Sequence, residues 1–129
     1  MTILDVYKSW LDKYGIKYEE TPDYLAFYHQ DVRFIIGNNA DDPQFFNIIM
    51  PRVFVFAQNP KVPRGRVLEA LNKVNHDFKV VKGICDDEEC WFTTEMFIAS
   101  GTNIDEYSER LVYILFQSFL RFRELIEGK

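Results

Sequence analysis

The segment that decides the fold runs from Val67 to Asp77 and reads Val-Leu-Glu-Ala-Leu-Asn-Lys-Val-Asn-His-Asp. Its apolar residues recur every three or four positions, which is typical of an amphipathic helix. Two apolar segments follow, and we expect Phe78–Cys85 and Cys90–Ala99 to form a β-hairpin around an acidic turn. A second helical pattern begins near Thr102 and extends to about Glu127. This succession of helix, hairpin and long helix is compatible with few fold classes.

The N-terminal half predicts a helix and then a run of strands. Helical spacing of apolar residues begins at Ile3, and Gly15 is placed to end the helix, as glycine often does. Pro51 lacks an N–H group, so the strand that contains it must have a bulge, a bend or an edge there. The four predicted strands are Ile16–Glu19, Tyr24–His29, Val32–Ile36 and Phe45–Ala57, with a tight turn at Gln30–Asp31.

The predicted order of elements is α-β-β-β-β-α-β-β-α. Short turns between consecutive strands favour antiparallel pairing, so the predicted fold class is α+β, an antiparallel sheet flanked by helices. The chain has 129 residues, which is enough for one hydrophobic core, and contains no internal repeat, low-complexity tract or linker. We therefore expect a single α+β domain over residues 1–129.

Composition and charge limit the classes of partner that can be expected. With 12 Phe and 7 Tyr the chain is unusually aromatic, which indicates either a Phe-rich core or aromatic surface that another molecule buries. The net charge of −5 repels a phosphate backbone, so no nucleic-acid partner is expected. No apolar run reaches the roughly 18 residues that span a bilayer, and the N-terminus is typical of a helix start and not of a signal peptide. We expect no membrane association and a cytoplasmic location.

The C-terminal helix carries two apolar stripes when its residues are placed at about 100° intervals. The main stripe is an ordinary core face. Tyr113, Phe116 and Leu120 fall roughly on the far side, with i, i+3, i+7 spacing. A helix that is exposed on this side should be polar there, so we interpret the second stripe as a self-association or partner surface. The alternative is that a neighbouring helix or the sheet edge covers it within the monomer.

The predicted hairpin also has two unlike faces. One face is consistently apolar, whereas the other mixes Trp91 and Phe97 with Lys82, Thr93 and Glu95. A sheet with one solvated face alternates more cleanly than this. We predict that the mixed face is an outward binding surface, on which Lys82 and Glu95 pair diagonally.

No catalytic constellation is found, since the sequence has no phosphate loop, dinucleotide fingerprint or nucleophile elbow. His29 and His76 could each act as a general base, but no pattern assigns either a partner, and surface or strand-edge positions are expected for both. Cys85 and Cys90 enclose four acidic residues, and a mixture of carboxylates and thiols suits no single metal. We predict no metal, no cofactor and no enzymatic activity, with the cysteines as free thiols.

A basic cluster lies at the start of the second helix. Lys61, Arg64 and Arg66 lie where exposed backbone N–H groups are also expected, and together they could bind a phosphate or a carboxylate. The alternative is a solvated basic turn that pairs with acidic neighbours.

From Arg66 onward the chain resembles the YbjN-like family of candidate bacterial sensory transduction regulators. The residues that carry the resemblance are Leu71-Asn72 and Asn75 on the second helix, followed by the hairpin and the closing helix, and the N-terminal half has the matching order. We expect the helix to stop at Asn75, because asparagine tolerates the left-handed cap conformation. The resemblance implies a fold like that of type III secretion chaperones, which are often dimeric, and it brings no catalytic residues.

The favoured hypothesis is a non-enzymatic regulatory module that binds a polypeptide partner or itself, as a homodimer, by burying apolar surface, with strand addition at a sheet edge as a further mode. Its candidate binding residues are Trp91, Phe97, Tyr113, Phe116 and Leu120. The alternatives are a small-anion sensor at the basic cluster and an enzyme that uses a histidine. An exposed apolar patch would favour the first, an enclosed polar pocket the second, and a histidine beside a carboxylate or thiol in such a pocket the third.

Overall fold

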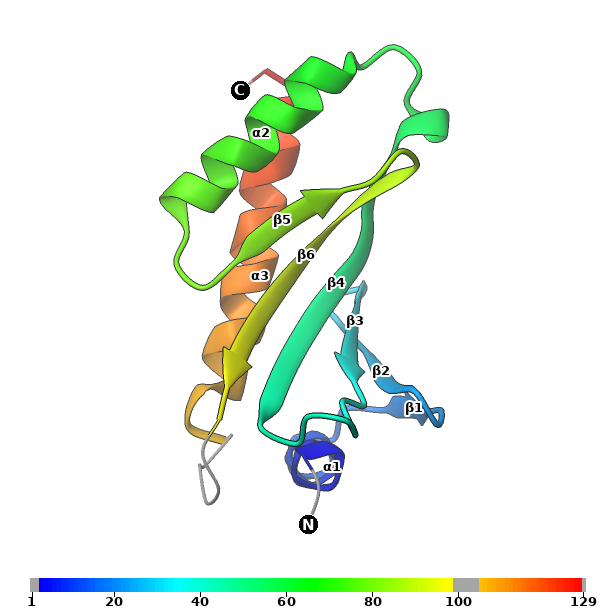
Figure 1. Ribbon diagram of the computed structural model, residues 1–129, viewed down its shortest axis with the longest axis vertical. Coiled ribbons are helices and arrows are strands. Elements are labelled where there is room, and N and C mark those ends of the chain that lie inside the picture. The colour runs from blue at the N-terminus through cyan, green and yellow to red at the C-terminus, as the bar shows by residue number, and fades with distance from the viewer. Residues whose placement is uncertain (1–2, 99–104, 129) are drawn as a thin grey trace.

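The structure, a computed structural model, describes residues 3–98 and 105–128. The elements along the chain are α1 (Ile3–Lys13), β1 (Tyr18–Glu20), β2 (Tyr24–His29), β3 (Val32–Gly37), β4 (Phe45–Val55), a 3-10 turn (Phe56–Gln58), α2 (Arg64–Asp77), β5 (Lys82–Cys85), β6 (Glu89–Phe97) and α3 (Asp105–Ile126) (Figure 1). This confirms the predicted order of helices and strands. None of the helices described is long and apolar enough to cross a membrane.

The six strands form one antiparallel sheet in the order β1-β2-β3-β4-β6-β5. The turn between β2 and β3 consists of Gln30 and Asp31, which both have positive φ, as a two-residue hairpin turn requires. The pairing of β4 with β6 is irregular between Met50 and Phe54. Pro51 lies in this irregularity, as predicted, and the extra residues there allow β4 to face the core on both sides of the bulge.

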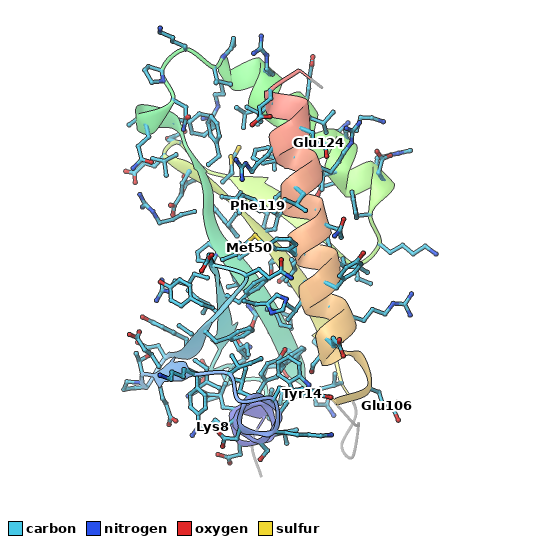
Figure 2. The ribbon with its side chains drawn as sticks, turned by 180° about the vertical axis from the view of Figure 1, so that it is seen from behind. Lys8, Tyr14, Met50, Glu106, Phe119 and Glu124 are labelled. Atoms are coloured by element: carbon cyan, nitrogen blue, oxygen red, sulfur yellow. The ribbon has the colours of Figure 1, made fainter. Side chains whose placement is uncertain are left out.

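The three helices among the described residues pack on one face of the sheet. Tyr7 of α1 stacks on Phe27 of β2 and Phe46 of β4, with ring centroids 6.3 and 5.6 Å apart. Phe122 of α3 meets Phe92 of β6 edge-on at 5.5 Å. Helix α3 lies behind the sheet in Figure 1 and in front of it in Figure 2, and α2 runs along β5 and against α3. Over the described parts of the chain, no helix covers the opposite face.

The core lies between the helices and the sheet. Its largest fully buried side chains are Tyr7, Phe27, Phe34, Phe46, Phe92, Phe122, Leu11, Leu25, Ile36, Ile48 and Met50. Burying a phenylalanine side chain stabilises the fold by up to about 3 kcal/mol relative to exposing it. Much of the aromatic content is therefore core, and only part of it is left for the surface.

Helix α2 is attached to the edge strand β5 at Gly83. Asn75 donates from Nδ2 to the Gly83 carbonyl at 3.2 Å, and the Gly83 N–H donates to Asn75 Oδ1 at 2.6 Å. A Cβ on Gly83 would lie 2.8 Å from Leu71 Cδ2 and 2.7 Å from Phe92 Cε1. The prediction that the helix stops at Asn75 is wrong, because α2 continues to Asp77 and the Asn75 amide takes the place of a neighbouring strand.

Other differences concern the ends of strands. Strand β5 begins at Lys82 and not at Phe78, because the Phe78 N–H still bonds to the carbonyl of Val74 in α2 and Val80 has a left-handed φ of 57°. The strand predicted to end at Ala57 gives way to the 3-10 turn after Val55. Ala99 and Thr102, at the predicted ends of the last strand and helix, lie outside the described residues.

Candidate functional site

The first candidate site is the face of the sheet that points away from the helices, here called the open face. Side chains alternate between the two faces along each strand, so the strand registers assign residues to it. Its members are Tyr24, Ala26, Tyr28, Arg33, Ile35, Phe45, Asn47, Ile49, Lys82, Ile84, Trp91, Thr93, Glu95 and Phe97. Apolar side chains predominate among them, although a solvated sheet face is normally polar.

Phe97 and Trp91, two of the predicted binding residues, lie on the open face. The Phe97 side chain is 76% exposed and contacts only the edge of Phe45 among the described aromatic rings, at a centroid distance of 5.9 Å. Trp91 is half-buried and lies opposite Ile84 of β5. When another surface covers a large ring that is this exposed, the free energy of the bound state falls. This makes the face suited to binding.

Two of the three charged side chains assigned to the open face form an ion pair, and the third, Arg33, lies over the ring of Tyr24. Lys82 forms an ion pair with Glu95, and because Lys82 lies directly opposite Thr93, this pair is diagonal, as predicted. Asn47 lies opposite Glu95 and accepts a hydrogen bond from Asn39 at 2.8 Å. Such an exposed ion pair contributes at most about 1 kcal/mol to stability, but it leaves neither of its two charges isolated on a surface that is mostly apolar.

The second stripe of α3 lies on the other side of the sheet. Tyr113 is 60% exposed, whereas Phe116 and Leu120 are half-buried. Phe116 meets His29 of β2 edge-on, with centroids 6.5 Å apart and an interplanar angle of 84°. The fold therefore covers part of this stripe itself, and it does not bring the five predicted binding residues together on one surface.

A pocket of about 610 Å³ lies between α1, β2 and the first half of α3. Tyr14 and Glu106, labelled near the lower end of Figure 2, come from two of its walls. Its lining is Trp10, Tyr14, Ile16, Phe27, His29, Gln30, Glu106, Glu109, Arg110, Val112 and Tyr113. Aromatic walls with a few charged groups are a common composition of small-molecule sites.

The two histidines have different surroundings. His29 lines the pocket, and its ring contacts are with Phe34 and Phe116, each at 6.5 Å. Among the residues described, His29 has no hydrogen-bonded carboxylate that would make it a general base. His76 is exposed on α2 and contacts Asp77 at 2.9 Å, and this hydrogen bond lowers the pKa of the Asp77 carboxyl.

The basic cluster is only partly available for an anion. Arg64 is held against the fold, since its guanidinium lies 4.5 Å from the Phe56 ring centroid and donates from Nη2 to the carbonyl of Asp86 at 3.1 Å. Lys61 and Arg66 are exposed. An anion site at this point, which stays a prediction, would have to rely mainly on these two side chains.

The hairpin turn between Cys85 and Cys90 is ordered by its first acidic residue. Asp86 Oδ1 accepts hydrogen bonds from the N–H groups of Glu88 at 2.8 Å and Glu89 at 2.9 Å, and these bonds lower the pKa of the Asp86 carboxyl. Both cysteines are free thiols. Within the described ranges, no group of three His, Cys, Asp or Glu side chains is arranged to hold a metal ion.

Sequence comparison identifies no relative, because neither a protein-family profile nor a curated protein matches the chain. Solved structures do match. An uncharacterized protein from Methanothermobacter thermautotrophicus is 17% identical, with a TM-score of 0.66 over 96% of each chain. A chain of the heterodimeric ExoU–SpcU complex, from the type III secretion system of Pseudomonas aeruginosa, is 18% identical, with a TM-score of 0.66 over 94% of this chain and 98% of that one.

A third similar structure is YbjN from E. coli, a candidate transcription regulator. It is 18% identical, with a TM-score of 0.60 over 94% of this chain and 89% of that chain. At this level of identity the likeness shows a shared fold. The expected α+β, type III secretion chaperone-like architecture is thereby confirmed.

Several open-face residues were missed at the sequence level. Phe45, Ile35 and Ile49 belong to it beside Trp91 and Phe97, since Ile35 pairs with Ile49 and Phe45 pairs with Phe97. The signal in the sequence is the segment from Phe45 to Met50, which is apolar except at Asn47. Side chains alternate between the two faces of a strand, so apolar residues at consecutive positions place some on each face.

Proposed function

We propose that this chain is a non-enzymatic regulatory module that acts as a single α+β domain and binds a polypeptide on the open face of its sheet. The observation that carries the proposal is a sheet face that no described helix covers and that is rich in apolar side chains, with Phe97 as its most exposed ring. A partner that buried Phe97 fully would gain up to about 3 kcal/mol from this side chain. Exposed aromatic residues of this kind often serve as anchors in protein interfaces.

The structural neighbours support a protein partner. One of them was solved as a heterodimeric complex, ExoU–SpcU, and another, YbjN, is a candidate regulator. The shared fold and the Leu71-Asn72 and Asn75 pattern support the further proposal that this chain is YbjN-like. The occupant of the open face would be a partner chain or a second copy of this chain in a homodimer, and the predicted cytoplasmic location stays a prediction.

Burial of a face, and not strand addition, is the binding mode that the geometry favours. On the β5 edge, the backbone groups of Gly83 that point away from β6 are already bonded to Asn75. The other edge strand, β1, has three residues, two of which are Glu19 and Glu20. Short and charged edges discourage pairing with another strand.

The test is the solution mass of the chain by light scattering, alone and mixed with a reduced, alkylated polypeptide that cannot fold. The wild type should form a dimer alone or a complex with the polypeptide, and Phe97→Glu should abolish that species. Tyr113→Glu is the matched control, because Tyr113 is similarly exposed but lies on the helical side. A wild type that stays monomeric in both samples, or a Phe97→Glu variant that keeps the species, would contradict the proposal.

The pocket supports a second candidate function, the sensing of a small molecule. Its aromatic walls and the charged Glu106, Glu109 and Arg110 would suit an organic ion. Amide signals followed by NMR, during titration with small organic acids, amines and phosphate, distinguish the sites. Saturable shifts near Trp10 and Tyr113 would support the pocket, shifts near Gly65 would support the basic cluster, and no saturable shift would rule out sensing of these ligands.

A further inference from the structure

Cys85 and Cys90 lie directly opposite each other at the last paired position before the β5–β6 turn. The N–H of Asp86 bonds to the carbonyl of Glu89 across the turn, whereas the N–H and carbonyl of Gly83 point away from β6 to Asn75. Hydrogen-bonded and non-bonded pairs alternate along an antiparallel ladder, so the cysteines occupy a non-bonded pair. In such pairs the Cα atoms are about 4.5 Å apart and the side chains are closest, which is within the range that a disulfide spans.

The two thiols differ in their surroundings. Cys85 is half-buried, and its Sγ lies 3.7 Å from Nη2 of Arg64. Cys90 is fully buried, and burial together with the neighbouring Cys85 raises the pKa of the Cys90 thiol to about 12. A reagent in solution therefore reaches Cys85 first, and Cys90 lies beside it as a buried, protonated thiol.

We propose that Cys85 and Cys90 are a redox modification site that closes to an intramolecular disulfide when the protein meets a hydroperoxide. In the first step the Cys85 sulfur attacks the hydroperoxide, the O–O bond breaks, an S–O bond forms, and the products are a sulfenic acid and an alcohol or water. In the second step the Cys90 sulfur displaces the hydroxyl group from Cys85. The S–S bond forms, and the Cys90 proton leaves with the hydroxyl group as water, so the two sulfurs together lose two electrons to the peroxide.

The site is placed to affect the open face. Ile84 precedes Cys85 and Trp91 follows Cys90, and these two neighbours lie opposite each other on the open face. A disulfide fixes the spacing of the two strands directly beside that pair. In a Trp10→Phe variant, Trp91 fluorescence therefore provides a second readout of closure, in addition to the chemistry of the thiols.

The experiment uses the folded, reduced full chain treated with hydrogen peroxide and followed by intact mass, thiol titration and peptide mapping. The wild type should lose two hydrogen atoms in mass and both titratable thiols together, yield a linked Cys85–Cys90 peptide without dimer formation, and recover on addition of dithiothreitol. Cys90→Ser should instead accumulate oxygen on Cys85, and Cys85→Ser should leave Cys90 unreacted because it is buried. Independent oxidation of the two thiols, a disulfide only between chains, or closure only in denatured protein would each overturn the proposal.

Discussion

Gly83 shows how a single residue positions an element. Its missing side chain leaves room for Leu71 of α2 and Phe92 of β6, and its backbone holds the Asn75 amide. Two members of the pattern by which the chain resembles YbjN-like proteins, Leu71 and Asn75, thus act on the same glycine. This gives the pattern a physical basis, which is the attachment of α2 to the edge of the sheet.

Gly83→Ala should destabilise the protein by about 1–3 kcal/mol, because the new Cβ would overlap Leu71 and Phe92 in a packed region. Gly65→Ala is the matched control. Nothing lies within 4 Å of a Cβ built there, and alanine favours a helix over glycine by about 1 kcal/mol, so this change should be neutral or stabilising. Urea denaturation of the three proteins measures both effects, and equal stabilities for wild type and Gly83→Ala would contradict this account.

Cys90 should make stability depend on pH in the alkaline range. Burial raises the pKa of its thiol in the folded state to about 12, above the value in the unfolded chain. As the pH rises, the thiol therefore loses its proton in the unfolded chain before it does so in the folded protein. The contribution of the protonated Cys90 to the free energy of unfolding is fully present below the unfolded pKa of about 8.5 and is lost progressively above it. Between about pH 9 and 11, the reduced wild type should lose up to roughly 1.4 kcal/mol per pH unit more than Cys90→Ala. Parallel stability curves for the two proteins would show that Cys90 is not the cause.

At the scale of elements, sequence periodicity predicts the type and order of every helix and strand but not all their ends. Strand β5 starts four residues later than expected, since the conformation of Val80 and the cap at Phe78 are decided by how α2 meets the sheet. The role of Asn75 was misread for the same reason. An asparagine near the end of a helix is typical of a cap, and only its tertiary partner, Gly83, reveals a different use.

Asn75→Ala should cost about 1–2 kcal/mol, because two backbone groups of Gly83 lose their partner at the sheet edge. Asn72→Ala is the control on the same helix. Asn72 is exposed, and alanine is the better helix former there, so its loss should leave stability unchanged or slightly raised. Thermal unfolding of both variants distinguishes them. Equal effects at the two positions would mean that the hydrogen bonds between the Asn75 amide and Gly83 do not contribute to stability.

Two aromatic residues of helix α3, Phe116 and Tyr113, should contribute unequally to stability. Phe116 packs on His29, whereas Tyr113, one turn earlier, is mostly exposed. Phe116→Ala should therefore lower the unfolding free energy by about 1–3 kcal/mol, and Tyr113→Ala should change it by less than about 0.5 kcal/mol. Denaturant titration provides the comparison. If Phe116→Ala were as stable as the wild type, this part of the second stripe would not be structural.

At the scale of the whole molecule, the sequence predicts the fold class and the mixed hairpin face with its Lys82–Glu95 pair. It does not predict on which side of the sheet the second stripe of the C-terminal helix lies. The sequence assigns Phe97 to the mixed hairpin face and Tyr113 to the second helical stripe, and it offers both as partner surface. The sheet separates them, since the described helices cover the face opposite Phe97. Periodicity describes each element alone, whereas a binding surface depends on how elements stack.

If binding buries the open face, it should reduce the exposure of Trp91. A Trp10→Phe variant, in which Trp91 is the remaining tryptophan, allows this exposure to be measured. Fluorescence emission and quenching by acrylamide would be recorded for the isolated chain and for the dimer or the complex with the unfolded polypeptide. Burial of Trp91 should give emission at shorter wavelength and several-fold weaker quenching in the bound species. Emission and quenching that stay the same on binding would contradict it, and would move the interface away from the open face.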